Sequence, residues 1–204
     1  MDVTLERTEI PHRKRWTREE CRHLRAAGFL PGHYELIDGE IIEKMPKNPP
    51  HRIAHMLLAA WLESLFGRFC VQTQDPIVLP VPDNNSTEPE PDVAVTRAPT
   101  MTYQDDNPGP EDLLLVGEVS DTTLAYDLRS KAALYAAAGI PEYWVLDVTG
   151  RRLCVHRRPA ADGYREVRIY GEAEEVSPLA RPDTAVLVAS LLPNAADADR
   201  IAAE

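Results

Sequence analysis

Three charged residues in this sequence stand in surroundings that suit active-site chemistry: Asp92, Glu118 and Lys131. Glu118 directly follows the apolar run Leu-Leu-Leu-Val-Gly. A lone carboxylate costs several kcal/mol to bury unless it is paired or bound to a metal ion. Gly117, just before it, leaves space for another group to approach closely. The alternative is that a strand ends here and Glu118 meets water.

Lys131 is unusual because it falls inside the apolar stripe of a predicted helix over residues 127–138. On a wheel of 100° per residue, the stripe contains Leu128, Ala132, Tyr135 and Ala138. The helix follows Glu118 after a loop of eight residues, 119–126. Its first turns therefore stay near the end of the strand, and Lys131 can reach Glu118. The alternative is that the flexible lysine extends outward into solvent.

Asp92 opens a short predicted strand directly after Pro91. Proline is tolerated at the start of a strand because its missing N–H lies outside the hydrogen-bond ladder of the sheet. Asp92 therefore sits at the mouth of the sheet, where sites of α/β proteins usually lie. Two carboxylates on adjacent strand ends suit Mg²⁺ (or Mn²⁺), which keeps waters and takes a substrate phosphate. Lys131 would orient or deprotonate the attacking water, or stabilise charge on the phosphate. We predict Asp92 and Glu118 as metal ligands and all three residues as catalytic.

The elements that position these residues begin with a helix and a hairpin. Thr17 and Glu20 form a capping box for a helix that Gly28 ends. Two short apolar arms flank Asp38-Gly39, a typical sequence for a tight hairpin. His51 begins a second helix, where it would contact phosphate or, as we favour, lie exposed. His33, His55 and His156 show no metal-ligand spacing, and we interpret them as structural or surface residues.

The remaining apolar pattern predicts an α/β fold, in which a mixed β-sheet is flanked by helices and hairpins. Helices are predicted at 51–69 and 127–138; strands at 70–79, 92–95, 113–119, 143–148, 153–156 and 164–170; and exposed loops at 80–91 and 97–111. The apolar segment 185–192 is ambiguous. We divide the chain into an irregular arm (1–15), a single domain (16–192) and a tail (193–204).

Composition limits the classes of protein that fit. The 204 residues are 44% hydrophobic, enough for a real core. The 22 basic and 33 acidic residues give a net charge of −11, which argues against a broad basic DNA-binding surface. It does not exclude a metal site, because the ion itself supplies positive charge. The three cysteines are widely spaced, and we expect reduced thiols. With no signal peptide or membrane-spanning stretch, we predict a cytoplasmic protein.

The pattern as a whole resembles the PD-(D/E)XK nuclease superfamily, and within it the bacterial Uma family of restriction-endonuclease-like proteins. The resemblance covers roughly residues 16–160. It rests on the order and spacing of Tyr34-Glu35-Leu36-Ile37-Asp38-Gly39-Glu40, His51, Pro91-Asp92, Glu118-Val119-Ser120, Lys131, Tyr135, Gly139 and Glu142-Tyr143-Trp144. It implies a restriction-endonuclease-like fold and a Mg²⁺-dependent endonuclease that hydrolyses DNA.

One departure from the superfamily pattern concerns Ser120, which stands where the superfamily has its lysine. The resemblance implies that this lysine has moved to the following helix, as Lys131, and that Ser120 caps the loop or binds an outer water. It also implies that Glu35 or Glu40 supplies a further acidic group. We count Glu40 among the catalytic candidates, although both acids fit equally well as exposed residues of the turn.

Two other functions remain open: a noncatalytic binding or assembly module, favoured by the net charge, and a metal-dependent hydrolase of a small phosphorylated or nucleotide substrate. The sequence has no P-loop, dinucleotide fingerprint or G-x-S-x-G elbow, which argues against several common enzyme classes. Since cutting both strands of a duplex usually takes two active sites, we predict a homodimer. Tyr143-Trp144 and the segment 185–192 are candidates for its interface.

Overall fold

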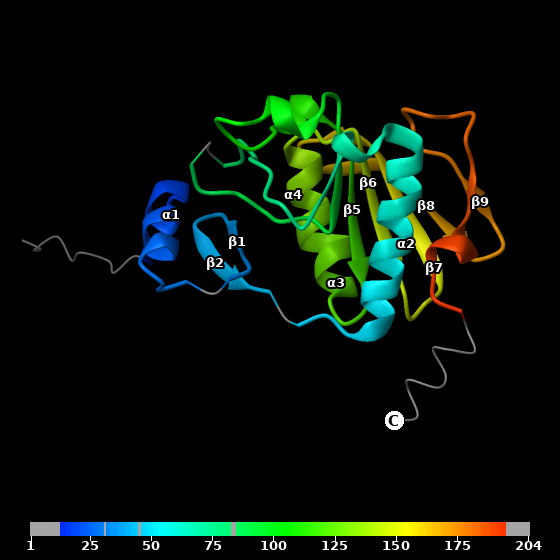
Figure 1. Ribbon diagram of the computed structural model, residues 1–204, viewed down its shortest axis with the longest axis horizontal. Coiled ribbons are helices and arrows are strands. Elements are labelled where there is room, and N and C mark those ends of the chain that lie inside the picture. The colour runs from blue at the N-terminus through cyan, green and yellow to red at the C-terminus, as the bar shows by residue number, and fades with distance from the viewer. Residues whose placement is uncertain (1–12, 31, 45, 83–84, 195–204) are drawn as a thin grey trace, which may run out of the picture.

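A six-stranded mixed sheet forms the centre of the computed structural model, which describes residues 13–30, 32–44, 46–82 and 85–194 (Figure 1). Its strand order is β3-β4-β5-β6-β7-β8, and only the β5–β6 pair is parallel. The strands are β3 (Val71–Thr73), β4 (Val93–Thr96), β5 (Leu113–Ser120), β6 (Glu142–Asp147), β7 (Arg152–Ala160) and β8 (Gly163–Gly171).

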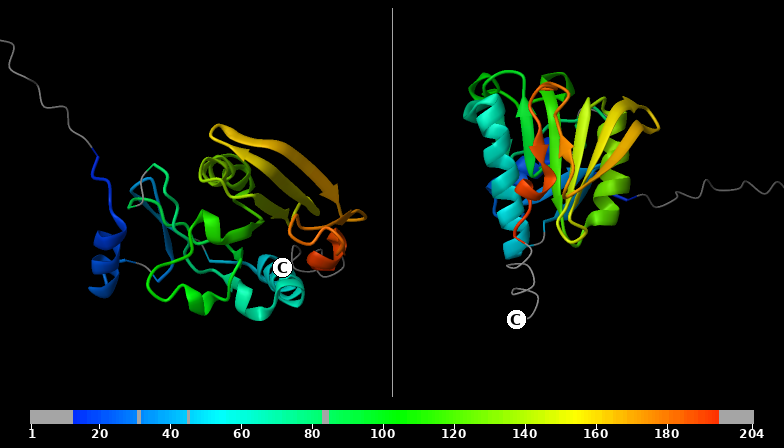
Figure 2. Two further views of the ribbon diagram at one scale, coloured as in Figure 1. Left: turned by 90° about the horizontal axis from the view of Figure 1, so that it is seen from above. Right: turned by 90° about the vertical axis from the view of Figure 1, so that its right-hand side faces the viewer.

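Helices cover the two faces of this sheet (Figure 2). α2 (Pro49–Phe66) packs on one face, over a core that includes Leu58, Val93 and Trp144. The other face is covered by a helix made of α3 (Leu124–Tyr126), a π-helical stretch (Asp127–Lys131) and α4 (Ala132–Ala137). The predicted fold class, a mixed sheet flanked by helices, is confirmed.

A helix and a hairpin lie beside the sheet, at the left of Figure 1. α1 (Arg18–Ala26) begins with the predicted capping box, in which Thr17 accepts from the backbone of Glu20. The hairpin pairs β1 (Tyr34–Ile37) with β2 (Glu40–Glu43). Asp38 and Gly39 both have positive φ, 50° and 75°, as a two-residue turn of this kind requires. Both local predictions are therefore confirmed.

Short elements complete the described part of the chain. They are the 3₁₀ turns Arg68–Cys70, Thr100–Thr102, Pro110–Asp112 and Val188–Leu191, and the strand pair β9 (Glu175–Val176) and β10 (Val186–Leu187). The ambiguous segment 185–192 is thus part strand and part 3₁₀ helix. Cys21, Cys70 and Cys154 are free thiols. Among the described residues, no helix is long and apolar enough to cross a bilayer.

The prediction of a strand over 70–79 and an exposed loop over 80–91 is wrong in its details. The strand β3 ends at Thr73, since Gln74 takes a φ of 56° and turns its N–H toward Pro91 and Asp92. Residues beyond it still run beside the loop, where Ile77 N donates to Pro89 O at 3.0 Å. Flanked in this way, the loop buries Ser86, Thr87, Glu90 and Pro91.

The predicted domain boundaries are only partly covered. Residues 1–12 of the N-terminal arm and 195–204 of the tail lie outside the described residues, and the single domain over 16–192 stays a prediction. The suggested dimer interface at Tyr143-Trp144 is wrong, because both side chains are fully buried within one copy. Trp144 stacks on Trp61, with ring centroids 6.0 Å apart.

Candidate active site

Asp92 and Glu118 lie side by side, where β4 begins and β5 nears its end. Val119 N donates to Asp92 Oδ2 at 2.9 Å, and Asp92 N donates to Glu118 Oε2 at 3.4 Å. Both residues are 3% exposed. The structure therefore brings the two predicted carboxylates together, and Glu118 does not face open water.

Gly117 allows β4 and β5 to approach at this point. It pairs with Val93 across the two strands. A Cβ atom added to Gly117 would lie 2.7 Å from Val93 Cγ2, which is shorter than side-chain carbons tolerate. The close approach expected beside Glu118 is thus present, and its partner is Val93.

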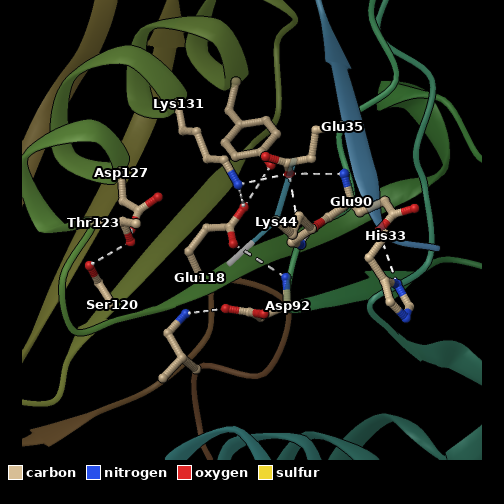
Figure 3. Close-up of polar contacts among 12 residues, drawn as sticks. His33, Glu35, Lys44, Glu90, Asp92, Glu118, Ser120, Thr123, Asp127 and Lys131 are labelled. Carbon is tan, nitrogen blue, oxygen red and sulfur yellow. Dashed lines mark hydrogen bonds and ion pairs between the residues drawn. The ribbon is translucent and has the colours of Figure 1, made fainter. Parts of the chain in front are cut away.

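Lys131 reaches the carboxylates from the helix on the other side. Its ammonium donates to Glu118 Oε1 at 2.8 Å and to Glu35 Oε1 at 2.9 Å (Figure 3). Tyr135, one helical turn on, donates its hydroxyl to the same Glu118 oxygen at 3.0 Å. Lys131 ends the π-helical stretch, a distortion that recurs at functional sites. Its side chain is 5% exposed, so the outward-pointing alternative is wrong.

Of the two hairpin acids, the structure brings Glu35 into the cluster and leaves Glu40 outside. Glu35 lies in β1, 3% exposed, and accepts from Glu90 N at 3.0 Å as well as from Lys131. The Glu40 side chain is 64% exposed and faces Arg13 at 3.4 Å. The choice of Glu40 as a catalytic candidate therefore has no support in the geometry.

Basic groups surround Asp92 on its other side. The Lys47 ammonium forms an ion pair with Asp92 Oδ1, and His51 Nε2 lies 3.5 Å from Oδ2. His55 Nε2 contacts the backbone oxygen of Asp92 at 3.0 Å. The side chain of His51 is only 12% exposed, so the favoured reading of an exposed histidine is wrong. Lys47 belongs to a proline-rich loop without periodicity, which is why the sequence did not reveal it.

Burial and neighbouring charges shift the pKa values of Asp92 and Glu118 in opposite directions. Burial would raise the pKa of Asp92, but His51 and Lys47 outweigh it and hold that pKa below its ordinary value. Burial raises the pKa of Glu118 to about 7, against the opposing effect of Lys131. Burial would lower the pKa of Lys131, but Glu118 and Glu35 together raise it. Lys131 therefore stays protonated.

A cavity of about 220 Å³ opens onto this cluster. The carboxylates and Lys131 line it. So do Lys47 from the loop before α2, His51 from the first turn of α2, and Asp121 and Thr123 from the β5–α3 connection. Ser120, the last residue of β5, has its Oγ 3.4 Å from Thr123 Oγ1 in the loop that follows. His156 packs against Tyr143 and Tyr164, as a structural histidine would.

The carboxylates of Asp92 and Glu118 suit Mg²⁺ better than they suit a metal ion whose ligands are all protein side chains. Among the described residues, no cluster of three or more His, Cys, Asp or Glu side chains is arranged to hold a metal ion. Mg²⁺ needs only one or two carboxylates, because waters and substrate complete its coordination. The Lys47 ammonium forms an ion pair with Asp92, so this carboxylate already has a cation as its partner. Asp92 and Glu118 are thus a chemically suitable pair.

Comparison with solved structures supports the fold. The chain resembles a protein from Anabaena variabilis ATCC 29413 described as "a putative nuclease belonging to DUF820", with a TM-score of 0.60 at 14% sequence identity. The match covers 82% of this chain and 96% of the other. No curated protein matches the chain. Residues 27–189 match the profile of the Uma2 family, described as "Putative restriction endonuclease", and the chain therefore belongs to that family.

Proposed function

We propose that the protein is a Mg²⁺- or Mn²⁺-dependent endonuclease that hydrolyses phosphodiester bonds in DNA. The observation that supports it most is the convergence of Asp92, Glu118 and Lys131 on one cavity. Family membership and fold point in the same direction. Asp92 and Glu118 would hold the ion, which when bound supplies Lewis-acid stabilisation of the phosphate and a more acidic water.

Lys131 acts in this proposal as a fixed positive charge rather than as a base. Its pKa is raised by Glu118 and Glu35, so it carries a proton at neutral pH and has no lone pair to accept one. It orients Glu118 through Oε1, which leaves Oε2 turned toward Asp92. Of the three roles that the sequence left open for Lys131, proton abstraction is the one that this geometry disfavours.

His51 is better placed to handle a proton near Asp92. Its Nε2 faces Asp92 Oδ2, while its buried Nδ1 has no hydrogen-bond partner among the described residues. Imidazole is the group that proteins use most often for general acid–base catalysis. We assign His51 the orientation or deprotonation of the attacking water, and Lys47 a contact with the substrate phosphate.

The test is cleavage of plasmid and oligonucleotide DNA, single- and double-stranded, with Mg²⁺ and with Mn²⁺. Asp92→Asn and Glu118→Gln should abolish cleavage while far-ultraviolet circular dichroism stays native. Asp121→Asn, at a carboxylate that lines the same cavity outside the cluster, should retain it. An intact native protein that cuts none of these substrates with either ion would refute the proposal.

The net charge of −11 favours one other function, a noncatalytic module that keeps the fold. Isothermal titration calorimetry separates the two, because a module without a working site would bind neither Mg²⁺ nor Mn²⁺. For the endonuclease we expect binding of either ion, lost in Asp92→Asn. Cutting both strands of a duplex calls for two active sites, so a homodimer is part of the endonuclease proposal.

A further inference from the structure

The strand β8 forms one outer edge of the sheet and is open to solvent along most of its length (Figure 2). It is nine residues long, and residues 165–169 are all exposed. Among the described residues, the backbone of 164–169 hydrogen-bonds only to β7. An edge strand presents unpaired N–H and C=O groups, and monomers protect such edges with charged side chains, proline or a covering element. β8 contains neither proline nor lysine, and its exposed charges are Arg165, Glu166 and Arg168.

Apolar side chains gather on one face of this edge. Val167 is 56% and Ile169 53% exposed, and both point to the face that carries Cys154 and His156 of β7. With the helix at Ala132 they line a groove of about 390 Å³. Adjacent exposed apolar residues beside a groove are typical of an interaction surface.

The charges of β8 identify the partner that fits. In an antiparallel pairing of two copies in which Val167 faces Val167, Glu166 of each copy lies opposite Arg168 of the other. Opposite charges directly across two strands stabilise the pair, whereas like charges destabilise it. Among the described residues, Arg168 pairs with the exposed Glu174 at 3.7 Å and lies over the ring of the buried Tyr170, 4.4 Å from its centroid. Its side chain is still 63% exposed, so it can reach a second copy.

We propose that β8 is a dimerisation edge, along which two copies of this chain pair antiparallel about Val167. The pairing joins the two six-stranded sheets into one continuous sheet and places Val167 and Ile169 of both copies at the junction. The inference rests on the edge and its charges, and it holds whether or not the chain cuts DNA. Its consequence for an endonuclease would be two active sites in one assembly.

The test is a charge swap read by sedimentation equilibrium and light scattering. The native protein should be a dimer at micromolar concentration. Glu166→Arg and Arg168→Glu should each raise the dimer dissociation constant by about tenfold or more, because each places like charges opposite one another. The double variant Glu166→Arg/Arg168→Glu should restore the native constant. Thermal unfolding of each variant checks that the fold survives.

A matched control reverses the same kind of charge at the opposite edge of the sheet. Arg68, exposed just before β3, is suitable, and Arg68→Glu should leave the dimer unchanged. A native monomer at about 100 µM would overturn the proposal, since that concentration corresponds to weak binding. So would single variants that dimerise like the native protein, or a double variant that does not recover.

Discussion

Replacing Lys131 with methionine tests the arrangement on which the site depends. Methionine keeps the length and apolar stem of lysine and removes the charge. Glu118 and Glu35, which both contact the ammonium, would then face one another without a cation. Both carboxylate side chains are 4% exposed, so water cannot replace the lost partner. We expect a folded but clearly less stable protein.

The size of the loss follows from the two contacts. At 2.8 and 2.9 Å, and with an effective dielectric constant of about 20, each attraction is worth about 6 kcal/mol before desolvation. Desolvation of the ammonium offsets most of this sum. Removing one partner of a buried ion pair typically costs about 3–5 kcal/mol, because a charge is left unpaired. We expect that loss in the free energy of unfolding at pH 8.

The assay is urea denaturation of native protein and Lys131→Met at pH 8 and pH 6, without divalent ions. The loss should be smaller at pH 6, because Glu118, whose pKa is already raised to about 7, takes up a proton in place of the ion pair. Lys14→Met is the matched control. Lys14 pairs with Glu20 at the surface, and its loss should cost about 1 kcal/mol or less.

The reasoning would be refuted by a variant whose stability at pH 8 lies within about 0.5 kcal/mol of native, the range of an ordinary surface substitution. That result would mean that the two carboxylates are hydrated in solution, or that they lie further from Lys131 than the distances above. A loss of equal size at both pH values would contradict the part assigned to Glu118.

Three further predictions concern pH, metal affinity and packing. Folded Glu118 keeps its proton up to about pH 7, whereas the unfolded chain releases it near pH 4.5, so the folded state binds more protons between these two values. The free energy of unfolding without metal should therefore fall by at most about 3 kcal/mol from pH 5 to pH 8. This fall should be absent in Glu118→Gln. Lys47→Met should bind Mn²⁺ about tenfold (about 1.4 kcal/mol) more tightly in calorimetry, because the lysine no longer competes with the ion for Asp92. Unchanged or weaker binding of Mn²⁺ would contradict this prediction. Gly117→Ala should lower the free energy of unfolding by about 1–3 kcal/mol in urea, because its Cβ meets Val93; a neutral effect would show that the strands shift freely.

Local features were predictable because their causes are local. A capping box at Thr17 and a left-handed turn at Asp38-Gly39 are specified by a few adjacent residues. The long apolar runs of α2, β5 and β6 carry their own periodicity or continuity. The prominence of Asp92, Glu118 and Lys131 has the same origin, since a charge inside an apolar stretch stands out in the sequence itself.

Choices between similar residues depended on contacts across the chain. Glu35 and Glu40 flank the same turn, and the sequence does not distinguish them. The hairpin docks against the loop before β4, where Leu36 exchanges backbone hydrogen bonds with Glu88, and this turns Glu35 inward. The same docking buries the loop that its prolines and polar residues predicted to be exposed.

The sequence by itself therefore determined the α/β class, most of the elements and the three charged residues. Tertiary structure alone decided which hairpin acid joins them, that Lys47 and His51 approach Asp92, and that Lys131 has two carboxylates as partners. The physical reason is that these contacts join residues far apart in the chain. A side chain in an irregular loop has no periodicity to reveal its direction, so only packing against the sheet sets which way it points.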